Sequence, residues 1–113
     1  MADHLTLAET SMLEATMLLR AASQAEIDLD PATNLTEIVL QDTIRLLAWH
    51  AIGLLPDDIT VDSPAPARLS VLDVAEQAEA ELRSLPIGQY PAGTDCLVVD
   101  LCQAITQART RAQ

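Results

Sequence analysis

Apolar residues recur three or four positions apart in four separate stretches of this chain, which is the spacing of one face of an α-helix. The stretches are separated by segments rich in proline, glycine and aspartate, which interrupt helices. Together they predict an all-α, single-domain four-helix bundle. The predicted helices cover residues 5–23, 35–55, 71–85 and 95–111.

The starts of three predicted helices carry the same local signal. A hydroxyl or amide residue stands three positions before an acidic residue, which is the spacing of a capping box. The pairs are Thr6 with Glu9, Asn34 with Glu37, and Ser70 with Asp73. These pairs therefore set the expected first turns of the helices.

The connections between the helices leave two topologies open. Short to moderate connections favour an up-and-down antiparallel bundle, which is the order we expect. The longest connection, Pro56–Arg68, could instead cross the bundle and make the second and third helices parallel.

The second helix has more apolar surface than a bundle helix needs. One stripe contains Leu35, Val39, Leu46 and Trp49, and a second stripe beside it contains Leu40, Ile44, Leu47, Ala51 and Leu54. At 100° per residue the two stripes merge into an arc of more than half the circumference, whereas a surface helix usually shows a narrower one. This helix is therefore either central or in contact with a partner.

Surplus apolar surface predicts self-association. Leu13, Met17 and Leu18 add apolar area on the first helix outside its seam. Leaving such a patch in water is unusual for a monomer, and a symmetric dimer is the commonest way to bury it. We expect a homodimer, or a complex with another protein, through the first or second helix. The candidate interface residues are Leu13, Met17, Leu18, Leu40 and Ile44.

Charge changes the picture of possible partners. The chain has 17 acidic residues against six arginines, no lysine, and a formal net charge of −11. Nucleic-acid binding requires clustered basic residues, and anionic lipid repels such a chain, so neither partner is expected. An alternative function is an acidic DNA mimic or binder of a basic partner, using Asp73, Glu76, Glu79 and the Pro56–Arg68 loop. The simpler interpretation of these acids is a solvated bundle exterior.

His50 is the strongest candidate for a ligand-binding or acid–base side chain. It falls inside the apolar arc of the second helix, with Thr43 one heptad earlier and Trp49 beside it. A second alternative function is therefore a small-molecule or enzymatic cavity around His50, Thr43 and Trp49. The simpler interpretation is a core histidine satisfied by a neighbouring polar group. No catalytic residue is assigned, and a non-enzymatic function is favoured.

No pattern indicates a metal or a cofactor. Paired histidines, ferritin-like carboxylates and glycine-rich phosphate loops are absent from the sequence. Cys96 and Cys102 are expected to be small buried hydrophobes in a reducing cytoplasm. The first residues lack the charge and apolar run of a secretory signal, and no run is long enough to span a membrane.

The segment from Leu46 to Pro56 resembles one found in a family of small uncharacterised helical proteins from streptomycetes. The shared pattern is Leu-Leu-x-x-His-x-x-x-Leu-Leu-Pro followed by an acidic residue. The chain differs from the family in having Ala48 and Trp49 where Arg and Gly are expected. The resemblance implies an actinobacterial, cytoplasmic setting and no particular chemistry. The expected function is therefore that of a cytoplasmic interaction module.

Overall fold

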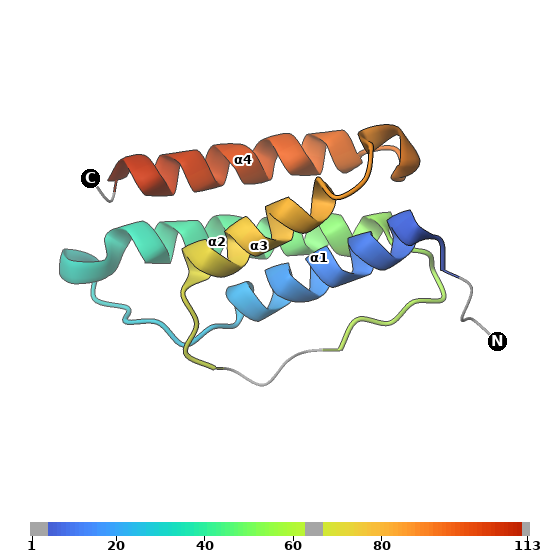
Figure 1. Cartoon of the computed structure of the whole chain (residues 1–113). Coiled ribbons are helices and arrows are strands. Elements are labelled where there is room, and N and C mark those ends of the chain that lie inside the picture. Colours follow the sequence, from blue (N-terminus) through green and yellow to red (C-terminus); the bar gives the residue numbers. More distant parts are fainter. Residues whose placement is uncertain (1–4, 63–66, 112–113) are drawn as a thin grey trace.

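The computed structural model describes residues 5–62 and 67–111, which form four α-helices and one short 3₁₀ helix. The expected all-α four-helix bundle is confirmed. The elements are α1 (Leu7–Ser23), α2 (Pro31–Leu54), α3 (Val71–Leu82), η1 (Ile87–Gln89) and α4 (Thr94–Arg111) (Figure 1).

The first helix forms as its sequence predicts. The Thr6 hydroxyl accepts from the Glu9 backbone N–H, and the Glu9 carboxylate accepts from the Thr6 N–H, so the capping box is complete. Apolar residues spaced three or four apart form the seam of α1 and are buried: Ala8, Met12, Ala15, Leu19 and Ala22. The α1 seam is thus the centre of the core.

The helix directions correct the expected topology. α1 and α4 run one way along the bundle, whereas α2 and α3 run the other way (Figure 1). The Val71 N–H at the start of α3 donates to Glu37 Oε1 near the start of α2, at 3.2 Å. The up-and-down order is therefore wrong, and the crossover alternative is correct. At about 3.3 Å per extended residue, the segment between Leu54 and Val71 can return along the whole of α2.

The start of α2 also differs from the prediction. Asp30 caps the helix by accepting from the Ala32 N–H, and Pro31 occupies the first turn, where its missing N–H has no cost. Asn34 interrupts the helix with non-helical backbone angles and donates to the Asp28 carbonyl. The Asn34–Glu37 capping box is wrong because Glu37 accepts from the first N–H of α3 instead.

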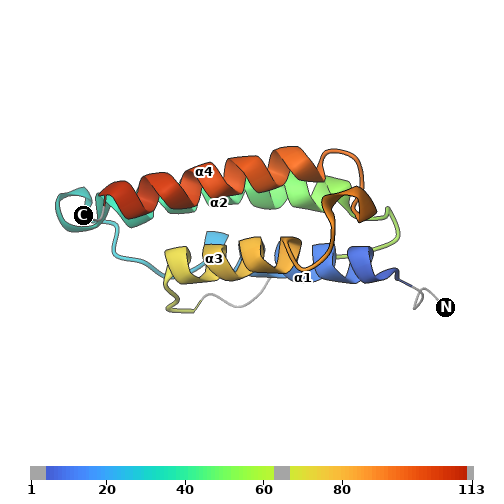
Figure 2. The same cartoon turned by 45° about the horizontal axis from the view of Figure 1, so that its top comes forward.

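The helices lie in two pairs, α1 with α3 and α2 with α4 (Figure 2). Between α1 and the end of α3, the Ser11 hydroxyl lies 2.8 Å from the Glu81 carbonyl and 2.9 Å from the Tyr90 hydroxyl. These buried polar groups satisfy one another, which fixes the turn after α3 against α1.

The third helix ends one turn earlier than expected. Arg83 is its C-cap, and the chain then turns towards Pro86, which cannot donate a helical hydrogen bond. Before α4, Gly93 adopts φ +99°, a conformation that favours glycine. A Cβ atom there would lie 3.1 Å from Leu54, so Gly93 also allows α4 to approach the end of α2.

Candidate functional site: an exposed apolar stripe on α2

The two apolar stripes of α2 differ in their exposure to solvent. The stripe that contains Ile44 and Ala51 is buried in the core except at its last member, Leu54, which is partly buried. The other stripe faces solvent, where Leu35 is 55%, Leu46 72% and Trp49 62% exposed. Asp42 and Gly53 continue this stripe at the same helical spacing. We call the six residues together the outer stripe: Leu35, Val39, Asp42, Leu46, Trp49 and Gly53.

The outer stripe continues onto the neighbouring edge of α1. The Arg20 guanidinium lies 5.9 Å from the centroid of the Trp49 ring, within cation–π distance. One turn before Arg20, Met17 is 49% exposed, and Leu13 is half-buried one turn further back. An apolar surface with arginine beside its tryptophan therefore spans two helices.

This surface is less acidic than the chain as a whole. Arg20 and Arg45, two of the six arginines, lie beside Trp49 and line a small hollow there. Asp42 is the acid within the stripe, and Arg45 Nη1 lies 2.9 Å from its Oδ1. Asp42 is thus the single acid among the six residues of the outer stripe.

The predicted interface residues divide into two groups. Leu40 and Ile44 are buried within a single chain, so they offer no surface to a partner and are replaced by the outer stripe. Leu13 and Leu18 pack partly against the core, whereas Met17 is exposed.

The predicted ligand residues are not brought together. Trp49 lies beside α1. The half-buried His50 lies near Gly93 at the start of α4, and a Cβ atom added to Gly93 would be 4.0 Å from His50 Nε2. The Thr43 hydroxyl donates to the Val39 carbonyl of its own helix. The three side chains therefore do not line a common cavity.

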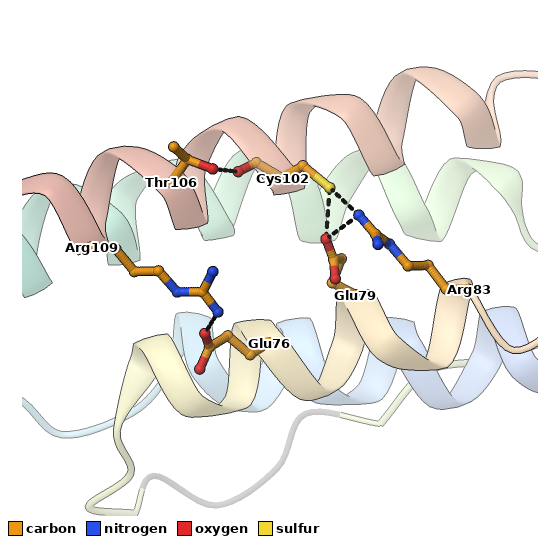
Figure 3. Close-up of polar contacts among 6 residues, drawn as sticks. All are labelled: Glu76, Glu79, Arg83, Cys102, Thr106 and Arg109. Carbon is orange, nitrogen blue, oxygen red and sulfur yellow. Dashed lines mark hydrogen bonds and ion pairs between the residues drawn. The ribbon is translucent and has the colours of Figure 1, made fainter.

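A polar cluster joins α3 to α4 (Figure 3). Arg83 Nη2 lies 2.9 Å from Glu79 Oε2 and 3.2 Å from the Cys102 sulfur. The Cys102 thiol donates to the same carboxylate oxygen at 2.6 Å. One turn along, Arg109 pairs with Glu76. These groups line a groove of about 330 Å³ between the two helices.

The chemistry of this cluster is that of a structural bridge. Burial and the hydrogen bond to Glu79 raise the pKa of the Cys102 thiol, although Arg83 opposes the rise. Because thiolates are the nucleophilic form, the raised pKa makes Cys102 less reactive at neutral pH. The hydrogen bond to Cys102, followed by the charge of Glu79, raises the pKa of Arg83.

Both cysteines differ from the expectation of buried hydrophobes. Cys96 is exposed, and Cys102 is half-buried within polar contacts; both are free thiols. Sequence spacing could not reveal this because the partners of Cys102 come from α3. Within residues 5–62 and 67–111, no group of three or more His, Cys, Asp or Glu could hold a metal ion.

The acids of α3 are not a uniform solvated face. Glu76 and Glu79 turn towards α4 and pair with arginines, whereas Asp73 is exposed at the helix start. Paired carboxylates present little free negative charge to a partner. This arrangement does not support the DNA-mimic alternative.

Sequence reasoning did not identify an apolar groove at the other end of α3 and α4. It has a volume of about 340 Å³ and lies between the end of α3, η1 and the first turns of α4. Ile87 and Val99 at its rim are half-exposed. Leu85 and Val98 line this groove without being fully buried.

None of the helices in the described ranges has the length and apolarity needed to cross a membrane. Comparison of the chain with protein-family models, curated proteins and solved structures gave no match. The resemblance to the streptomycete family therefore stays a prediction.

Proposed function

We propose that this protein works by binding another polypeptide chain through the outer stripe of α2, as a cytoplasmic interaction module. The observation that carries the proposal is the exposure of Leu46 and Trp49 on the side of α2 away from the core. They stand one turn apart on a helix that already contributes a full stripe to the core.

The composition of this surface is typical of binding sites. Tryptophan and arginine are enriched among the residues that carry most of the binding energy at protein interfaces. Trp49 and Arg20 supply both residue types in one contact. Removing about 100 Å² of apolar surface from water contributes roughly 2.5 kcal/mol, so Leu46 and Trp49 could each contribute substantially to an interface.

The folded chain does not need these side chains for its own core. Arg20 holds Trp49 from one side, while most of the indole remains accessible. Such a preordered aromatic group binds with a small loss of conformational entropy. These properties support the use of this surface for binding.

Substitution of Leu46 by Glu tests the proposal. We expect L46E to keep the helical circular dichroism of the parent and to lose association, measured by light scattering and by co-purification with tagged protein. The matched control is L7E, because Leu7 is 76% exposed on α1 outside this surface. Equal association of parent, L46E and L7E would contradict the proposal.

A further inference from the structure

We propose that the occupant of the outer stripe is the outer stripe of a second copy, packed antiparallel about a two-fold axis near residue 44. This inference rests on the proposed function and names its partner. Three properties of the stripe support it: its spacing, the sizes of its side chains and the placement of its charges.

The spacing is that of a coiled-coil seam. Successive members of the outer stripe are separated by four, three, four, three and four residues, from Leu35 to Gly53. This alternation keeps a line of side chains on one side of a helix over its whole length, facing a partner helix. Because Asn34 is the interruption in α2, the seam begins where the uninterrupted helix begins.

The sizes of the side chains match when the second helix runs antiparallel. With the axis near residue 44, Leu35 faces Gly53 of the second copy, and Val39 faces Trp49 of the second copy. Each large group thus faces a smaller one, which permits close packing. A Cβ atom at Gly53 would meet nothing within 4 Å in its own chain, so the space beside Gly53 is open to the Leu35 side chain of a second copy.

The charges also select this orientation. In a parallel pair, Asp42 would face Asp42 of the second copy directly, and like charges in contact are destabilising. In the antiparallel pair, Asp42 faces Leu46 and lies at nearly the same level as Arg45 of the second copy. The exposed Asp42–Arg45 pairs can therefore be shared between the copies.

The net charge of each copy limits the affinity of the dimer. Each copy carries −11, so long-range repulsion opposes association and salt weakens that repulsion. Standard interfaces bury about 800 Å² per partner, and a single helix contributes less than this. The adjoining Met17 and Leu13 extend the contact, and we expect a dissociation constant on the order of micromolar.

The first measurement is the molar mass by light scattering from about 1 to 200 µM protein, a range chosen around that dissociation constant. We expect a dimer that tightens severalfold between low and high salt, and a dissociation constant at least 100-fold weaker for L46E. A parent chain that stays monomeric throughout overturns the self-pairing. If that monomer binds another protein through Leu46, the proposed function survives without this inference.

The second measurement establishes the orientation. Single cysteines are placed at Leu35→Cys or Gly53→Cys in a chain whose native Cys96 and Cys102 are replaced by serine. With a short bismaleimide linker, we expect covalent dimers when the two variants are mixed and little product from either alone. Cross-linking of each variant to itself would show a parallel pair and overturn the proposal, as would a dimer that L46E leaves intact.

Discussion

The inner and outer faces of α2 both carry large apolar side chains but have opposite surroundings. Ile44 on the inner face is fully buried between the helices, whereas Leu46, half a turn away, is 72% exposed. The inner face is the one that the other helices of the same chain cover. Apolar character alone therefore does not decide whether a helix face stabilises its own chain or remains available to another.

The two faces should respond differently to the same kind of substitution. Inner-face changes should lower the free energy of unfolding of the monomer. Outer-face changes should leave the monomer almost unchanged and act on association. This separation makes α2 a direct comparison of folding and binding surfaces within one helix.

The largest expected effect comes from Ile44→Ala. Removing a fully buried isoleucine side chain leaves a cavity and should cost about 2–5 kcal/mol of unfolding free energy. The matched change Leu46→Ala should stay within about 0.5 kcal/mol of the parent. Both values come from urea denaturation at protein concentrations low enough to keep the chain monomeric. Similar losses for the two variants would remove the distinction between the faces.

A smaller effect is expected from Gln41→Ala, at the edge of the inner face. Gln41 is buried, and its Nε2 donates to the carbonyls of Ala22 and Ala25 at 3.2 and 2.9 Å. Removing the amide takes a hydrogen-bond donor from these two carbonyls and should lower the free energy of unfolding by about 1–3 kcal/mol. Gln103→Ala, at an exposed position of α4, is the control and should be nearly neutral. A neutral Gln41→Ala would show that water replaces the amide.

The smallest expected change, from Gly53→Ala, is a gain in monomer stability. The new Cβ meets nothing within 4 Å, and alanine favours the helix by up to about 1 kcal/mol. Gly93→Ala should instead destabilise, because Gly93 has φ +99° and Leu54 lies 3.1 Å from the new atom. Thermal unfolding measures both. If the outer stripe pairs, Gly53→Ala should also weaken association while strengthening the monomer, and a gain in both would contradict the pairing.

The sequence predicted the helices and their seams well because periodicity and caps are local properties. The Thr6–Glu9 capping box and the Ser70 cap of α3 formed as expected. The Asn34–Glu37 box did not form, because a tertiary contact with Val71 took the Glu37 carboxylate. Local spacing carries no information about such a competitor.

The candidate site could be predicted only in part. The width of the apolar arc of α2 indicated a surplus stripe, and Trp49 and Leu46 were in it. Which half of the arc stays exposed to solvent depends on where α1 and α4 pack against α2. Their packing buries Leu40 and Ile44 in the core. The crossover depends on the path of the connection after α2, which periodicity does not encode. The Glu79–Cys102 contact likewise requires the placement of α3 beside α4.

The crossover has a consequence for how the chain is made by the ribosome. α1 is synthesised first, yet it packs against α3, and Ser11 contacts Glu81 across 70 residues of sequence. Part of its buried face, which includes Ser11, therefore stays exposed while α2 and the long connection emerge. During that interval the nascent chain displays two apolar helices without their later neighbours, and chaperones recognise such surfaces. We expect a nascent chain that stops before α3 to aggregate more readily than the complete protein.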